Sequence, residues 1–120
     1  MKVVRITNVK PAKGGAPLFT GDVTLQSPFA DVDAADLSIT YVHFSKGVRN
    51  KSHTHSNDQV LIVTKGKGIV ATKGKEERVS EGDIIWVQAG ETHWHGADKD
   101  GDFTHISVTR SQTKLQQVEK

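Results

Sequence analysis

The sequence predicts an all-β domain, a sandwich or barrel of short strands, and three observations support this prediction. Between residues 18 and 109 most apolar runs are short and rich in Val, Ile, Thr and Phe. Gly, Asp, Asn or Lys-Gly interrupts these runs at close intervals. No segment of ten or more residues has a convincing 3.6-residue period, and the tail at residues 112–120 is the one candidate for a short helix or a frayed end.

Eight strands account for the apolar runs. They are expected at residues 3–9, 19–26, 37–44, 59–64, 68–72, 77–80, 83–88 and 103–109. Two glycine turns, at residues 65–68 and 73–75, lie between strands, and glycine adopts positive φ there without steric penalty. These turns predict hairpins, so the middle of the chain is expected to be a β-meander.

The length and composition favour a single folded domain over residues 1–120. Basic residues are scattered among a similar number of acidic ones, so a nucleic-acid partner is not expected. The first fifteen residues contain no apolar run that could serve as a signal peptide or a membrane span, so we expect a cytoplasmic protein without a membrane partner. The chain has no cysteine, so any metal must be held by nitrogen and oxygen ligands.

The histidines are clustered, and four of the six form His-x-His pairs. His53 and His55 are two residues apart, so on a strand both imidazoles point to the same side. Gln59 follows past a polar turn and opens the next apolar strand, where its side-chain carbonyl can be a third ligand. His93, at the end of a later strand, can supply a fourth ligand. The plain alternative is that these histidines cap strand ends and only form hydrogen bonds.

Three imidazoles and one neutral amide predict a single divalent transition metal. Mn(II), Fe(II), Ni(II), Co(II) and Zn(II) accept such ligands, whereas Ca(II) and Mg(II) prefer shells made of oxygen. An octahedral ion held by four protein ligands keeps open positions, where a small-molecule substrate could bind.

The histidine pattern resembles the two motifs of the cupin family. Gly47-x5-His53-x-His55-x3-Gln59-x6-Gly66 is similar to the first motif, with glutamine in place of the usual glutamate. Gly82-x5-Gln88-x-Gly90-x2-His93-x3-Ala97 is similar to the second, with Gln88 where proline is usual and Ala97 where asparagine is usual. The resemblance implies a double-stranded β-helix, or jelly-roll barrel, with its core at about residues 19–109.

Further segments resemble one subgroup of small cupins, which includes manganese-dependent hydroxynitrile lyases. They are Phe19-Thr20-Gly21, Gln59-x-Leu61-Ile62-Val63, Glu91-x-His93-Trp94-His95-Gly96-Ala97 and Thr104-His105-Ile106. The resemblance implies manganese as the preferred metal and places Thr40 and Val42 in the substrate pocket. Strand alternation adds Phe44 to the same face and turns His43 away from the metal.

His105 is the candidate general base. It shares its strand face with Ser107 and Thr109, and on the family geometry all three side chains face the cavity. An imidazole with an ordinary pKa near about 6.5 can move protons at neutral pH. The alternative is that His105 only supports the metal ligands. His95 is expected to point outward or to support the ligands, because Gly96 suggests that the chain is already turning.

These features predict a metal-dependent lyase with the metal as Lewis acid, and cyanohydrin cleavage is one instance. An Fe(II)-dependent dioxygenase is the alternative enzyme. A non-catalytic module that binds a small ligand is the second alternative. Exposed strand edges, such as the one expected at residues 3–9, predict a homodimer or homotetramer.

Overall fold

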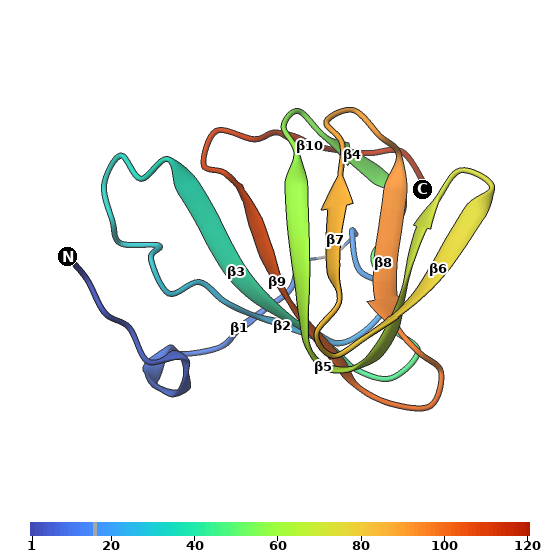
Figure 1. Cartoon of the computed structure of the whole chain (residues 1–120), viewed down its shortest axis with the longest axis horizontal. Helices are drawn as coiled ribbons and strands as arrows, with labels where there is room; N and C mark the ends of the chain where they lie inside the picture. The colour runs from blue at the N-terminus through green and yellow to red at the C-terminus, as the bar shows by residue number, and fades with distance from the viewer. Residues whose placement is uncertain (16) are drawn as a thin grey trace.

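Antiparallel strands dominate the computed structural model, which describes residues 1–15 and 17–120. They form one curled sheet in the order β1-β2-β3-β9-β5-β8-β4-β10, and β6 and β7 also pair with β5 (Figure 1). The all-β prediction is confirmed. The elements are η1 (Ile6–Asn8), β1 (Ala12–Lys13), β2 (Val23–Gln26), β3 (Leu37–Phe44), β4 (His53–His55), β5 (Gln59–Thr72), β6 (Lys75–Ser80), β7 (Ile84–Val87), β8 (His93–Ala97), β9 (Phe103–Arg110) and β10 (Leu115–Gln117).

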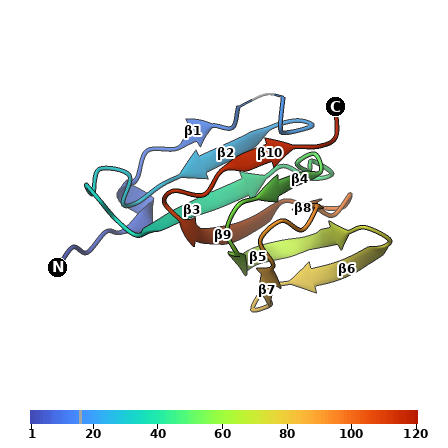
Figure 2. The ribbon, with the colours of Figure 1, turned by 90° about the horizontal axis from the view of Figure 1, so that it is seen from above.

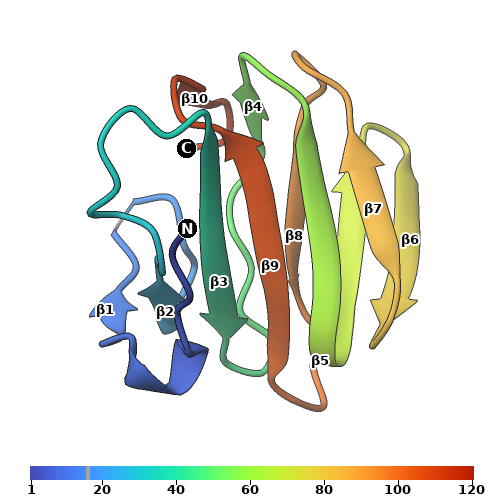
Figure 3. The ribbon, with the colours of Figure 1, turned by 60° about the vertical axis from the view of Figure 1, so that its left-hand side comes forward.

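The long strand β5 joins the two sides of the curled sheet. Its first half pairs with β7 and β9, and its second half pairs with β6 and β8. The register with β9 shifts between Val63 and Lys65, and such a β-bulge bends the strand. In Figure 3, β3, β9 and β5 lie in front of β4 and β8. The bend therefore lets one strand contribute to both sides of the barrel.

The structure confirms one of the two predicted glycine turns and contradicts the other. Residues 65–68 do not form the predicted hairpin turn, because they continue β5 through its bulge. Residues 73–75 do form a hairpin, in which Thr72 pairs with Lys75 and Gly74 has a φ of 75°. The meander prediction therefore holds for β5 and β6, whereas β7 returns to pair with the first half of β5.

The two ends of the chain also differ from the prediction. Residues 3–9 form no strand and include η1 instead, and the Gln26 side chain donates hydrogen bonds to the carbonyls of Ile6 (3.1 Å) and Val9 (2.8 Å). Residues 112–120 contain the strand β10 rather than a helix, because Leu115 lies opposite His55 in an antiparallel pair with β4. A side chain and a distant strand thus decide conformations that the local pattern left open.

Gly66 is required for the bulge in β5, and we predict a large effect of Gly66→Ala. Gly66 has a φ of 78°, and a Cβ there would collide with the backbone carbonyl of Asp102. Gly74 has nearly the same φ of 75° but open space around its Cβ position. Left-handed φ costs an L-residue about 1–2 kcal/mol, and overpacking adds about 1–3 kcal/mol. Gly66→Ala should therefore lower the free energy of unfolding well beyond Gly74→Ala in denaturant titrations, and equal losses would contradict this reading.

The inward side chains of β3 and β9 change from apolar to polar along the strands. Phe44 and Phe103 lie opposite each other with ring centroids 6.0 Å apart, and both are almost fully buried. The next inward pairs along the two strands are Val42 with His105 and Thr40 with Ser107. One end of the barrel interior is therefore packed core, and the other end carries polar groups.

The outer surface bears on two of the predictions. No helix among residues 1–15 and 17–120 is long and apolar enough to cross a membrane. The predicted homodimer or homotetramer stays a prediction, and the edge expected at residues 3–9 does not exist. Among the described strands β7 pairs with β5 alone, and its Ile84 and Trp86 side chains are 70% and 61% exposed. Light scattering on the purified protein would measure the oligomeric state.

Candidate metal centre

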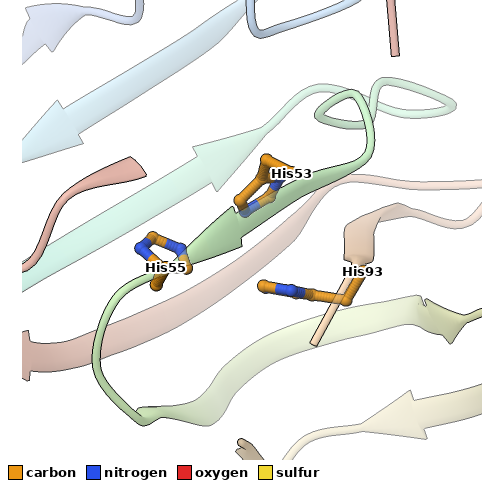
Figure 4. Close-up of side chains that lie close together, drawn as sticks. All are labelled: His53, His55 and His93. Carbon is orange, nitrogen blue, oxygen red and sulfur yellow. The ribbon is translucent and has the colours of Figure 1, made fainter. Parts of the chain in front are cut away.

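Three histidines from two neighbouring strands converge inside the barrel. His53 and His55 lie on β4, and His93 opens β8 directly opposite His53 in the antiparallel pair. Their ligand nitrogens all lie within 4.8 Å of one another, and Figure 4 shows the three rings grouped around one point. Because side chains two apart share one face of a strand, β4 presents both of its imidazoles to that point.

Backbone carbonyls determine which nitrogen of two rings carries the proton. His53 Nδ1 donates to the carbonyl of Lys51 at 2.7 Å, and His93 Nδ1 donates to the carbonyl of Glu91 at 2.9 Å. Each ring therefore holds its proton at Nδ1 and keeps a lone pair at Nε2. This arrangement orients metal-binding histidines in many proteins.

Gln59, at the start of β5, completes the group. Its Nε2 donates to the Ser107 hydroxyl at 2.8 Å, which leaves Oε1 facing His93 Nε2 at 3.0 Å. Both facing atoms carry lone pairs, so no proton links them while His93 is neutral. Among the described residues, neither ring nitrogen of His55 has a hydrogen-bond partner, although both are buried. A cation bound by the Nε2 atoms of His53 and His93, Gln59 Oε1 and one nitrogen of His55 would give each of these lone pairs a partner, so the residues fit a divalent transition metal.

Burial keeps the clustered imidazoles neutral. Desolvation, with a smaller contribution from neighbouring histidines, lowers the pKa of His53 and of His55 to about 4, while the hydrogen bond of His53 to the Lys51 carbonyl opposes its shift. Desolvation also lowers the pKa of His93, while its hydrogen bond to Glu91 opposes that shift. A metal binds only the deprotonated nitrogen, so these rings are ready to bind at neutral pH without first losing a proton.

A cavity of about 160 Å³ lies beside the histidine cluster. Thr40 and Val42 border it, as the family resemblance implied. Phe44 and Thr109 are not among the residues that border it. The Phe44 ring packs instead against the rings of His95 and His105, at 5.9 and 5.5 Å, because it belongs to the packed end of the barrel. The lining residues are Leu18, Phe19, Thr40, Val42, Asn50, His53, His55, Gln59, His95, His105, Ser107 and Leu115.

His105 and His95 form a buried pair at this cavity. His105 Nε2 lies 2.9 Å from His95 Nδ1, and His105 is fully buried. Desolvation lowers the pKa of His105 to about 3, far from the ordinary value used in the sequence analysis, and lowers the pKa of His95 as well. Two neutral imidazoles joined by one hydrogen bond retain one donor and one acceptor, so the pair can both give and receive a proton.

Of the two alternatives for His95, the outward orientation is wrong, because the side chain is buried beside the ligand His93. β8 stays regular through Gly96, so His95 shares the inward face with His93, and their rings stack at 5.6 Å. Gly96 is small because the chain at Val48 and Arg49 passes against it, and a Cβ would lie 2.6 Å from the Val48 carbonyl oxygen. His43 does face away from the cluster, and it contacts Thr104 and Gln26 at 2.9 and 2.7 Å.

The structure adds three residues that the sequence analysis did not identify, and one of them, Leu18, borders the cavity. Asn50 is buried, its Oδ1 accepts the backbone N–H of His95 at 2.8 Å, and its Nδ2 lies 3.2 and 3.4 Å from the two ring nitrogens of His95. Leu115 borders the cavity from β10. Asn50 occupies an unspecified position of the first motif, and the two leucines lie outside both motifs, so only their long-range contacts reveal these residues.

Comparisons with known proteins agree with this architecture. A family model described as "Cupin domain" matches residues 40–109. The chain belongs to the cupin family. This cupin is 37% identical over 109 residues to an (R)-mandelonitrile lyase from Granulicella tundricola, a match that covers 90% of this chain and 83% of that protein.

Solved structures confirm the predicted jelly-roll barrel. The cupin is similar to a cupin-like protein from Thermotoga maritima, with 29% identity and a TM-score of 0.85 over 91% of this chain and 85% of that chain. It is also similar to the polyketide cyclase RemF from Streptomyces resistomycificus, with 22% identity and a TM-score of 0.88 over 100% of this chain and 87% of that chain. At 22% identity the second likeness concerns the fold alone.

Proposed function

We propose that this cupin is a metal-dependent lyase that cleaves a cyanohydrin into an aldehyde and hydrogen cyanide. The observation that carries the proposal is the position of the His95–His105 pair, which borders the same cavity as His53, His55 and Gln59. The 37% identity to a mandelonitrile lyase supports the reaction class. A metal held by His53, His55, Gln59 and His93 would supply Lewis acidity toward the substrate hydroxyl oxygen.

The cavity walls orient the substrate. Val42, Phe19 and Leu115 provide apolar contacts for the organic group, while Thr40 and Ser107 offer hydroxyls on one side of the cavity. Apolar walls with a few polar groups are typical of small-molecule sites.

His105 moves the proton. The role of base requires the tautomer in which His105 Nε2 donates to His95 Nδ1, because Nδ1 of His105 then keeps a lone pair. In the other tautomer Asn50 Nδ2 donates to His95 Nε2 at 3.2 Å, the shared proton lies on His95, and His105 Nδ1 is a donor.

In the first of these tautomers, His105 Nδ1 takes the hydroxyl proton as the oxygen forms its double bond to carbon. The carbon–carbon bond breaks, and its electron pair leaves with cyanide. His105 then returns that proton to the cyanide ion, and burial, which lowers the pKa of His105 to about 3, favours this return. The same burial makes His105 a weak base, so the first transfer would depend on the Lewis acidity that a bound metal supplies to the hydroxyl oxygen.

The test is a benzaldehyde assay with purified protein, Mn(II) and mandelonitrile. We expect benzaldehyde to form faster than with metal-free protein, and His105→Ala to lose that activity while keeping the metal. No benzaldehyde above the metal-free background would contradict the lyase proposal for this substrate. Oxygen consumption by the Fe(II)-loaded protein with a candidate substrate would instead favour the dioxygenase alternative.

The neutral amide of Gln59 keeps the centre more cationic than a glutamate would, and we predict opposite effects of Gln59→Glu on binding and turnover. The variant keeps the shape of the side chain, and the Ser107 hydroxyl can donate to the new carboxylate. Attraction between unit charges 4 Å apart is about 4 kcal/mol at an effective dielectric of about 20. Mn(II) affinity should therefore rise at least tenfold by competition titration, while kcat falls. An equal or higher kcat would contradict a role for the neutral amide.

A further inference from the structure

We propose that the C-terminal strand β10 positions His53 and His55 for the metal, and that Glu119 is the positioning residue that holds β10 in place. This inference rests on the metal-binding part of the proposed function. It concerns residues 113–119, which the metal motifs do not include.

The strand that carries two of the ligands depends on β10 for most of its pairing. β4 has only three residues, and it pairs with β8 at the single position His53 opposite His93. Its other edge pairs with β10 along its whole length, so that Leu115, Gln116 and Gln117 face His55, Thr54 and His53. Figures 1 and 2 both show β10 beside β4. On its inner side, within the part of the chain that the structure describes, β4 has only its pair with β8 and the hydrogen bond from Gly90 N–H to the His55 carbonyl at 2.9 Å, so β10 supplies most of its strand pairing.

Hydrogen bonds hold β10 against β4 at both ends. At one end Ser56 N–H donates to the Lys114 carbonyl at 3.0 Å, and Lys114 N–H donates to Ser56 Oγ at 2.8 Å. At the other end Val118 N–H donates to the Ser52 carbonyl at 2.8 Å. The two ligand histidines lie between these anchors, so a shift of β10 would move both imidazoles.

Glu119 makes the strongest of the end contacts. Its two carboxylate oxygens accept hydrogen bonds from the Arg49 guanidinium at 3.0 and 2.7 Å, and Oε1 also accepts the Ser52 N–H at 2.9 Å. A bidentate contact between arginine and a carboxylate fixes the relative position of the two side chains better than a single hydrogen bond does. These hydrogen bonds, with that of Arg49 first, lower the pKa of Glu119 to about 2, so it stays ionised at neutral pH.

Arg49 carries the connection to the strand of the third histidine. Its guanidinium stacks over the Trp94 ring at 4.7 Å, and Trp94 follows His93 in β8. Arg49 also donates to the Asn50 carbonyl at 3.0 Å. One carboxylate on the C-terminal segment is therefore linked to both strands that supply histidines.

The same strand also forms part of the cavity wall. In an antiparallel pair, residues that face each other share one side of the sheet, so Leu115 lies on the side of His55. Leu115 borders the cavity accordingly. β10 thus affects both the metal ligands and the space beside them.

The experiment compares Glu119→Gln with Glu77→Gln, a matched loss of one carboxylate from the exposed Lys75–Glu77 pair on β6. Glu119→Gln should weaken Mn(II) binding about 10- to 100-fold, the range typical of residues that orient metal ligands. It should also speed amide hydrogen exchange across residues 53–56 in the metal-free protein. Glu119→Asp and Arg49→Lys, which keep the charges, should each show a smaller change in both readouts. Glu77→Gln should show neither.

The outcomes separate this inference from the proposed reaction. If Glu119→Gln binds Mn(II) as tightly as Glu77→Gln does, the positioning role is wrong whether or not the protein cleaves mandelonitrile. If Glu119→Gln only lowers the melting temperature and leaves affinity and exchange at residues 53–56 unchanged, the contact is merely structural and the inference is also overturned. If the wild type binds Mn(II) without cleaving mandelonitrile, the lyase proposal alone fails. If the wild type binds no divalent transition metal, both fail.

Discussion

His55→Ala should abolish stoichiometric metal binding with only a small loss of stability in the metal-free protein. Both ring nitrogens of His55 are buried without a hydrogen-bond partner among the described residues, so the ring has no hydrogen bond to lose. Removing the ring leaves no hydrogen-bond partner unsatisfied, so the cost to the metal-free protein is limited to the lost packing against His53 and His93. The loss of one ligand should lower Mn(II) affinity by more than the factor of about 10–100 that is typical of a residue behind a ligand. Metal analysis and thermal unfolding of the metal-free variant would measure the two effects.

His43→Ala is the matched control, with the opposite expected pattern. His43 is also a histidine on an inner strand, but it faces away from the cluster and contacts Thr104 and Gln26. Its removal breaks these hydrogen bonds, so the melting temperature should fall while metal content stays at the wild-type level. Retention of metal by His55→Ala, or loss of metal from His43→Ala, would contradict the assignment of the site.

Acid should destabilise the metal-free protein in a window set by its buried histidines. Burial lowers the folded-state pKa of His53 and His55 to about 4 and of His105 to about 3, whereas the unfolded chain titrates near 6.5. Below pH 6.5 the unfolded state therefore binds more protons than the folded state. Stability is fully present above that pH and is lost as the pH falls toward the folded values. Between its unfolded and folded pKa values, each such histidine lowers the free energy of unfolding by about 1.4 kcal/mol for each unit that the pH falls.

Denaturant titrations of the metal-free protein at several pH values between about 7 and 4.5 would measure this slope. The Glu119 carboxylate, with a pKa lowered to about 2 from 4.5, adds its own loss of stability only below that range. The window above pH 4.5 therefore isolates the histidines. A free energy of unfolding that stays constant between pH 7 and 5 would mean that the imidazoles are not held neutral by burial.

The fold class and the histidine cluster could be predicted from local pattern. The alternation at residues 37–44 predicted β3 with its bounds unchanged, and this strand places Val42 inward and His43 outward. The His-x-His spacing brought His53 and His55 to one side of a strand. Both signals depend only on the two-residue period of a strand, which the chain carries in every short segment.

Contacts between distant segments decided the backbone conformation at two glycines where the local sequence pattern predicted a turn. The local sequence around Gly66 predicts a turn. In the structure β5 instead continues through a β-bulge at this point, where Gly66 packs against the backbone of Asp102. Gly96 also suggests a turn, yet the passage of Val48 and Arg49 keeps β8 straight and turns His95 inward.

What the sequence by itself determined is a β domain with grouped imidazoles, because strand periodicity and ligand type are local properties. Only the tertiary structure decided the neutrality of those imidazoles, the pairing of His95 with His105, and the placement of β10 beside β4. Desolvation and strand pairing depend on residues far away in the chain, which no short segment encodes. For that reason the pKa of His105 follows from its burial rather than from the ordinary value of a histidine.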